Sequence, residues 1–256
     1  MAEYLPDLAP VSMLLLLVCS FLGSFLSASL GVGGGSFLIA VMASLLPAAA
    51  LIPVHGIVQL GSNASRAYLT RQHTQWRKVA FFALGALIAA TLAGFLLGRL
   101  DTQYIPPLVG VFILWLSWGK MPDIGLGNKP AGLLAGGLLT TLATMLVGAT
   151  GPLVSAWLGR SGTDRWQYTA NFSASMTLQH TVKVVAFGIT GFVYQQWLIL
   201  LVLMIISGYL GTKAGLLMLG KIPEQKFRTL FKWVLTVLSI RLIWVWLSAQ
   251  SGLLSS

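Results

Sequence analysis

The sequence predicts an all-α polytopic membrane protein, built from two inverted repeats of about five segments each, with interrupted or re-entrant helices. Three observations support this class: 56% of the 256 residues are hydrophobic, only 9% are charged, and the mean hydropathy is +0.83. Because soluble domains carry roughly 25% charged residues, a water-exposed surface around a core is excluded. Disorder is excluded as well, because it requires low hydrophobicity and high charge.

Apolar runs give the segments in order. They fall at 11–30, 36–46, 51–70, 77–98 and 104–119, and then at 130–147, 152–159, 166–190, 196–218 and 227–247. A membrane-spanning helix needs about 20 residues, so the chain leaves no room for a soluble domain. The runs 36–46 and 152–159 are too short to cross about 30 Å of hydrocarbon. We expect these two to be half-helices or re-entrant pieces.

The two sets of runs look like copies of each other. A shift of 117 residues pairs Gly31 with Gly148, Gly34 with Gly151, Arg66 with Lys183, and Ile105-Pro106 with Ile222-Pro223. Glycine is common in this chain, so the pairing of two basic residues inside apolar runs is the better signal. The sequence therefore predicts a first membrane repeat at 1–120 and a second at 121–256, within one integral membrane unit.

Loop charges predict the orientation of the repeats. The loop 71–78 contains three basic residues and should be cytoplasmic by the positive-inside rule, whereas its counterpart 190–196 is uncharged and should lie outside. Corresponding loops on opposite sides indicate an inverted repeat, which is an architecture of secondary transporters. Both termini should then be periplasmic. Residues 1–10 carry acids and no basic residue, unlike a cleaved signal peptide, so the first run should remain in the protein.

The first interruption is Gly31-Val-Gly-Gly-Gly-Ser36. Four glycines in five residues do not favour a regular helix. One interpretation is an unwound segment whose free N–H groups at Gly33, Gly34 and Gly35, together with a helix starting near Ser36, face an anion. The other is close helix packing through small residues. A dinucleotide site is excluded, because no strand precedes the glycines.

The second interruption is Val147-Gly-Ala-Thr-Gly-Pro-Leu153. Pro152 suits the first turn of a new helix, and Thr150 offers a hydroxyl group beside Gly151. The break is therefore repeated with different chemistry. We expect the two half-helices to approach the midplane from opposite faces of the membrane.

A polar stripe follows the run 51–70. His55, Gln59, Ser62 and Arg66 are spaced for one helix face, with Asn63 beside them. An arginine at the membrane centre costs roughly 2.5 kcal/mol or more, so the stripe should face the protein interior. The alternative is that Arg66 extends to the cytoplasmic surface, because it lies about one turn from the loop.

The run 166–190 carries a second polar row, formed by Asn171, Ser175 and Gln179, with His180 and Lys183 beside it. Histidines and the single cysteine are scattered over different segments, so no metal site is expected. No Ser-His-Asp set is plausible, because no acidic residue lies at depth. The sequence therefore predicts neither an enzyme nor a cofactor.

The position of the acids carries most of the argument. The six acidic residues lie in predicted loops or tails, at Glu3, Asp7, Asp101, Asp123, Asp164 and Glu224. Arg66 and Lys183 therefore have no carboxylate partner at depth, which is costly for buried cations. A transported anion would relieve this cost. If protons are coupled to transport, His55, His180 or the substrate must carry them.

These motifs together resemble the sulfite exporter TauE/SafE family of bacterial membrane permeases. In the first half the likeness lies in Gly31 to Gly35, Ser62-Asn-Ala-Ser65-Arg66 and His73-Thr-Gln-Trp76-Arg77. In the second half it lies in Gly148 to Pro152, Gln179-His180, Lys183 and Phe187-Gly188. The chain departs from the family pattern at Ala40, where proline is usual, and at Thr150-Gly151-Pro152, where a further Gly-Gly-Gly is common.

The resemblance implies transport of sulfite, an organosulfonate or a related sulfur-containing anion, commonly outward. With the predicted repeats, we expect an inner-membrane secondary transporter that works by alternating access at a midplane site between them. The expected partners are the small anion, the lipid bilayer, and protons or another coupling ion, but no nucleic acid. The candidate binding residues are Gly33, Gly34, Gly35, His55, Gln59, Asn63, Arg66, Thr150, Gly151, Asn171, Gln179, His180 and Lys183. A passive anion channel and a carboxylate transporter remain as alternatives.

Overall fold

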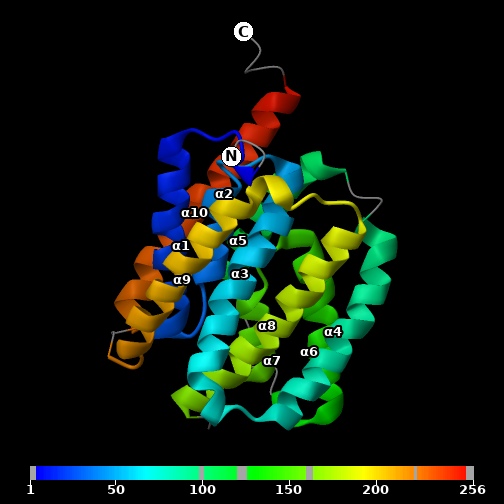
Figure 1. Ribbon diagram of the computed structural model, residues 1–256, viewed down its shortest axis with the longest axis vertical. Helices are drawn as coiled ribbons and strands as arrows, with labels where there is room; N and C mark the ends of the chain where they lie inside the picture. The colour runs from blue at the N-terminus through cyan, green and yellow to red at the C-terminus, as the bar shows by residue number, and fades with distance from the viewer. Residues whose placement is uncertain (1–3, 98–100, 120–125, 160–163, 222–223, 252–256) are drawn as a thin grey trace.

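The computed structural model describes residues 4–97, 101–119, 126–159, 164–221 and 224–251, and over these ranges the chain forms ten α-helices and no strand (Figure 1). The predicted all-α class is confirmed. Three sequence landmarks, Glu3, Asp123 and the Ile222-Pro223 pair, lie outside the described residues.

Each predicted apolar run corresponds to one helix, with the ends shifted by up to four residues. The first half holds α1 (Pro10–Leu30), α2 (Gly34–Met42), α3 (Ala48–Thr70), α4 (Trp76–Leu97) and α5 (Ile105–Trp118). The second half holds α6 (Pro130–Val147), α7 (Gly151–Leu158), α8 (Arg165–Ile189), α9 (Leu198–Leu217) and α10 (Glu224–Gln250). Glu224, expected in a loop, is instead the first residue of α10. The helices α2 and α7, with 9 and 8 residues, are the short pieces that the run lengths predicted.

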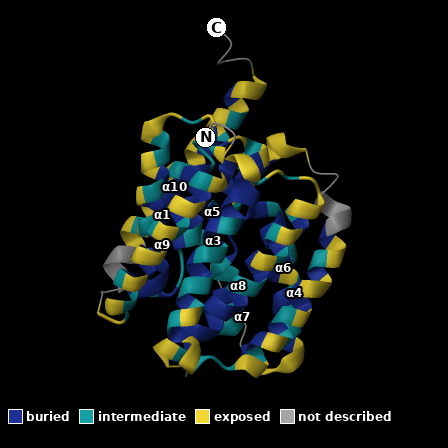
Figure 2. Cartoon of the chain, in the orientation of Figure 1, coloured by how far each residue is buried: buried dark blue, intermediate teal, exposed yellow. Residues whose placement is uncertain are grey.

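Two long helices with polar faces, α3 and α8, lie at the centre of the bundle. Within the described residues, five segments are long and apolar enough to cross a membrane: α1, the first part of α4, α6, the segment Gln195–Leu217 that contains α9, and most of α10. The helices α3 and α8 are not among them. Buried residues concentrate where they pack together, and exposed residues cover the outer helices (Figure 2). The polar side chains of α3 and α8 therefore face protein, as the polar stripe on 51–70 predicted.

The central helices run antiparallel. The ring of His55 in α3 lies 6.1 Å from that of His180 in α8, and Arg66 further along α3 lies over Phe172, nearer the start of α8. At the end where α3 finishes and α8 begins, the side chain of Asn171 accepts a hydrogen bond from the backbone N–H of Gln75 at 2.7 Å. The loop that follows α8 therefore lies at the opposite end of the bundle from the loop that follows α3.

Two outer pairs enclose the centre: α1 packs along α9, and α4 packs along α6. Both crossings are close enough to require glycine. A Cβ atom on Gly211 would lie 2.2 Å from the carbonyl oxygen of Phe21, and one on Gly85 would lie 2.0 Å from that of Leu134. Small residues that let helix backbones approach are typical of membrane helix pairs. Each outer pair joins one helix from each half of the chain.

Candidate functional site

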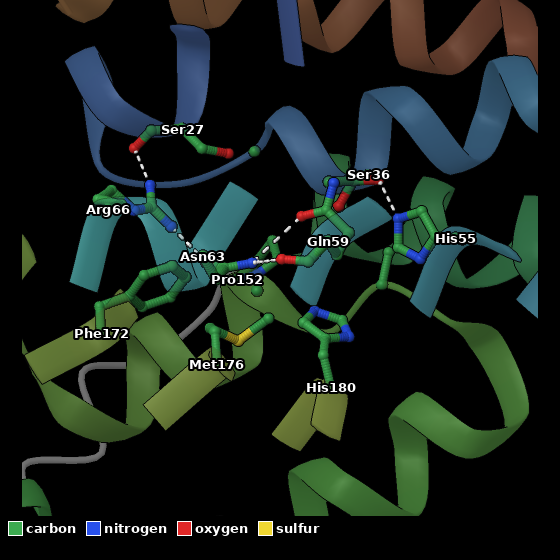
Figure 3. A pocket seen from close by; sticks show the side chains of 14 residues that line it. Ser27, Ser36, His55, Gln59, Asn63, Arg66, Pro152, Phe172, Met176 and His180 are labelled. Atoms are coloured by element: carbon green, nitrogen blue, oxygen red, sulfur yellow. Dashed lines mark hydrogen bonds between the residues drawn. The ribbon is translucent and has the colours of Figure 1, made fainter. Parts of the chain in front are cut away.

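A small cavity lies where the two helix breaks meet the central helices (Figure 3). Its volume is about 20 Å³, which is space for roughly one water molecule. It is lined by Ser27, Gly33, Gly35, Ser36, His55, Gln59, Asn63, Arg66, Ala149, Gly151, Pro152, Phe172, Met176 and His180. Both halves of the chain therefore contribute to one polar site.

The first break is shorter than the sequence suggested. Gly31 and Gly33 adopt φ angles of 90° and 112°, which glycine tolerates and other residues rarely adopt. Helix α2 then begins at Gly34, not near Ser36 as expected. The earlier start still leaves N–H groups for a ligand, because the N–H groups in the first turn of a helix have no intrahelical partner. Gly35 thus lines the cavity from within a helix.

Gly34 serves packing. A Cβ atom there would lie 1.7 Å from the carbonyl oxygen of Gly23 in α1. It does not line the cavity, unlike its neighbours Gly33 and Gly35. Both interpretations of the glycine run therefore apply, to different residues: two glycines turn the chain, and Gly34 lets α2 approach α1.

The second break follows the same plan. Gly148 has a φ of 77°, and Pro152 occupies the first turn of α7 as predicted. Gly151 lines the cavity, and a Cβ atom on it would lie 3.7 Å from Cγ2 of Val32 in the first break. The start of α7 and the start of α2 are therefore neighbours. In Figure 1, α2 extends from there toward one end of the bundle and α7 toward the other.

Arg66 is buried at the cavity wall, with only 2% of its surface exposed. Its Nη1 donates to the carbonyl oxygen of Ser27 at 2.5 Å, and its Nη2 donates to Oδ1 of Asn63 at 2.6 Å. Its Nε has no hydrogen-bond partner among the described residues. The guanidinium carbon also lies 5.3 Å from the ring centre of Phe172. The alternative in which Arg66 reaches the cytoplasmic surface is therefore wrong.

Two amides support this arginine. The Nδ2 group of Asn63 donates to the backbone oxygen of Gln59 at 2.8 Å and lies 3.4 Å from its Oε1. A Cβ atom on Gly35 would lie 3.1 Å from the same Oε1, so Gln59 abuts the first turn of α2. Asn63 thus orients Arg66, and Gln59 joins α3 to the break.

Lys183 is buried completely but does not line the cavity. Its Nζ donates to the carbonyl oxygen of Gly148 at 3.0 Å. Its stem crosses onto α3, because a Cβ atom on Gly56 would lie 2.9 Å from Cε of the lysine. Lys183 therefore holds the end of α6 to the centre and adds positive charge behind the cavity wall.

The polar row of α8 faces its neighbours instead of the cavity. The Nε2 of Gln179 donates to the hydroxyls of Thr140 and Thr141 at 3.0 and 3.2 Å, and its Oε1 accepts from Thr150 at 3.1 Å. Asn171 binds Gln75 at the end of the bundle. The cavity-facing row of α8 is one residue later, at Phe172, Met176 and His180.

The model of the family described as sulfite exporter TauE/SafE matches residues 16–242, which include both breaks, both central helices and every lining residue of the cavity. The chain belongs to the sulfite exporter TauE/SafE family. Members of this family are membrane transporters of sulfite or related anions and not enzymes. No curated protein and no solved structure matches the chain.

For this TauE/SafE chain, the cavity gathers most of the predicted candidates: Gly33, Gly35, His55, Gln59, Asn63, Arg66, Gly151 and His180. It leaves aside Gly34, Thr150, Asn171, Gln179 and Lys183. Within the described chain, no group of three His, Cys, Asp or Glu side chains could hold a metal ion.

Sequence reasoning missed several residues of the TauE/SafE cavity. Ser27 was detectable, because Ser20, Ser24 and Ser27 form a buried row at helical spacing along α1. Phe172 and Met176 gave no polar signal, since apolar residues in a membrane helix are the expected background. The only sequence signal for them was helical spacing, because His180 follows Met176 by four residues and Phe172 by eight.

Proposed function

We propose that this chain exports a small sulfur-containing anion, sulfite or an organosulfonate, across the bacterial inner membrane by alternating access at the cavity. Membership of the TauE/SafE family establishes membrane transport of sulfite or a related anion. The observation that carries the finer proposal is Arg66, a fully buried cation on the cavity wall whose hydrogen-bond acceptors are both uncharged.

The charge of Arg66 favours an anion. Its partners are a backbone oxygen and an amide oxygen, and no acidic side chain binds it within the described residues. A unit charge about 4 Å away is worth about 4 kcal/mol at an effective dielectric constant of 20. The unpartnered Nε leaves a further N–H for a ligand. An anion beside this group therefore gains charge attraction as well as hydrogen bonding.

The arrangement of donors favours an oxyanion with three oxygens. Arg66 comes from α3, the first turn of α2 reaches the cavity at Gly35 and Ser36, and that of α7 reaches it at Gly151. First-turn N–H groups are free to bind anions, and the helix dipole adds to their attraction. Donors from three directions suit the pyramidal oxygens of a sulfite or sulfonate. A carboxylate has two oxygens in one plane and would leave one direction unused.

The size of the cavity and the likeness of the two halves support alternating access. A volume of about 20 Å³ is too small for an anion of four heavy atoms, so the surrounding helices must separate to admit one. Helix boundaries recur at the 117-residue offset. Helix α1 ends at Leu30 and α6 at Val147, and α2 begins at Gly34 and α7 at Gly151. Counterparts α3 and α8 pack antiparallel, which supports two inverted repeats, 1–120 and 121–256, that rock against each other.

Basic residues support the orientation. Arg71, Lys129 and Arg165 all lie at the end of the bundle where α3 finishes and α6 and α8 begin. The positive-inside rule places this end in the cytoplasm and both termini in the periplasm. The inside-negative membrane potential then drives outward any anion that crosses with net negative charge, in the direction of export.

The test is transport by the purified protein in liposomes loaded with radiolabelled sulfite or methanesulfonate. We expect saturable efflux that external unlabelled anion accelerates, and we expect Arg66→Ala to abolish it. Arg71→Ala is the matched control, because Arg71 is exposed and contacts the carbonyl and the ring of nearby Tyr68 away from the cavity. Wild-type transport by Arg66→Ala would refute the site. Efflux that never saturates and shows no exchange would support the channel alternative.

A further inference from the structure

His180 is a buried side chain that the packing does not explain. Only 1% of it is exposed, it lines the cavity, and neither of its ring nitrogens has a hydrogen-bond partner among the described residues. Figure 3 shows its ring extending from α8 toward Gln59 and His55. A neutral imidazole always keeps one nitrogen with a lone pair. A buried polar group without a partner costs free energy, so a ligand or a proton is expected to use it.

His55 faces the same space from α3. The two ring centres lie 6.1 Å apart, with the planes at 80°. The Nε2 of His55 lies 3.1 Å from the carbonyl oxygen of Gly35. Because a carbonyl only accepts, Nε2 carries the hydrogen in the neutral ring, and the lone pair is on Nδ1. That Nδ1 lies near the backbone of Gly148 but makes no hydrogen bond of good geometry among the described residues, so both rings offer a basic nitrogen.

The charged groups around the pair all have the same sign. Facing His180 are His55 and Arg66 from α3, and Lys183 from the next turn of α8. The helices α6 and α7 contribute no titratable side chain. The basic residues of α4 and of the 71–73 turn lie at the far end of α8. Without an anion, a proton on either ring is repelled. An anion in the cavity offsets this positive potential, so a proton on either ring costs less when the anion is bound.

We propose that the His55–His180 pair takes up one proton when an anion enters the cavity and carries it across the membrane with the anion. The inference rests on the proposed function. A proton from water adds to the lone pair of one ring nitrogen, an N–H bond forms, and neutral imidazole becomes imidazolium. Linkage requires that anion and proton strengthen each other's binding equally. The pair thereby sets the charge moved per anion: a sulfonate crosses without net charge, and a dianion crosses with one negative charge.

The experiment is calorimetric titration of the purified full chain with methanesulfonate, in two buffers of equal pH and different ionisation enthalpy. Methanesulfonate stays ionised near neutral pH, so any proton taken up goes to the protein. We expect about one proton per anion bound, and an affinity that rises up to about tenfold for each unit by which the pH is lowered.

Variants assign the proton. His180→Gln removes a ring that makes no hydrogen bond with the described residues, so the fold has little to lose. We expect proton uptake per bound anion to fall toward zero and the pH dependence of the affinity to flatten, whatever the affinity itself becomes. His73→Gln is the matched control, because His73 is a loop histidine that stacks on Trp166 away from the cavity. It should keep one proton per anion.

Two results would overturn the inference. One is wild-type binding of methanesulfonate without proton uptake. The other is full uptake in His180→Gln, in His55→Gln and in the double variant. A failure of the proposed function is distinguishable, because neither methanesulfonate nor sulfite would then bind to the wild-type protein at all.

Discussion

Arg66 and Lys183 each donate a hydrogen bond to a backbone carbonyl at the end of the helix that precedes a break. Arg66 donates to the carbonyl oxygen of Ser27 in the last turn of α1, and Lys183 donates to that of Gly148, which follows α6. Carbonyl groups at a helix C-terminus carry partial negative charge and attract cations. Each carbonyl also accepts a bond from its own half, from the N–H of Gly31 or the hydroxyl of Thr144, and the break that follows provides the free N–H groups of the next helix. One interruption therefore both holds a cation and faces the cavity.

The first prediction separates the charge of Lys183 from its volume. Lys183→Met keeps the length of the side chain and removes a buried charge, so its free energy of unfolding should change by no more than about 1 kcal/mol. Anion affinity should fall about threefold to tenfold, because positive potential behind the cavity is lost. Thermal unfolding in detergent and sulfite binding measure the two effects. A large loss of stability with unchanged affinity would show that Lys183 acts only as a structural tie.

The second prediction compares neighbouring glycines. Gly34→Ala places a methyl group 1.7 Å from a backbone oxygen of α1, so α1 and α2 must separate. We expect a loss of about 3 kcal/mol or more, seen as a low yield of folded protein. Gly35→Ala meets the end of the Gln59 side chain at 3.1 Å, which can move. That variant should fold and transport less. Equal stability of the two variants would contradict the packing role of Gly34.

The third prediction concerns Gln179, whose amide joins α8 to α6 and to the second break. Gln179→Ala leaves Thr140, Thr141 and Thr150 without this partner and should cost about 1–3 kcal/mol of stability. The variant that folds should bind anion with near wild-type affinity, because Gln179 does not line the cavity. Gln59→Ala, which opens the cavity wall, should do the reverse. Weaker anion binding by Gln179→Ala without a loss of stability would show that Gln179 contributes to the binding site.

Much of the fold could be predicted because membrane helices are long apolar runs bounded by glycine, proline and charge. The ends of α6 agree with the predicted 130–147, and the short runs gave α2 and α7. The start of α2 was placed two residues late, because glycine propensity does not show that Gly34 is fixed by contact with Gly23. A contact between different helices decides that boundary, and no local pattern records it.

The site was predictable on α3 and less so on α8. On α3 the polar residues His55, Gln59, Asn63 and Arg66 line the cavity, although Ser62 of the same stripe does not. On α8 the polar row was visible, but its direction was not, because polar side chains in a membrane bundle can bind another helix as well as line a cavity. Thr140 and Thr141 of α6 provide that other partner for Gln179. The cavity instead meets the adjacent row that ends at His180.

The last prediction tests the inverted repeat through the loops that follow α3 and α8. Gln72 and Val193 are exposed and lie at opposite ends of the central helix pair. Cys19 is the only cysteine and is buried, so Cys19→Ala supplies a background for labelling. Because positive charge surrounds residue 72 and none surrounds 193, Gln72→Cys should react with a membrane-impermeant maleimide only in inside-out vesicles, and Val193→Cys only in intact spheroplasts. Labelling of both from the same side would mean that the halves are parallel and that the cavity is not placed between inverted repeats.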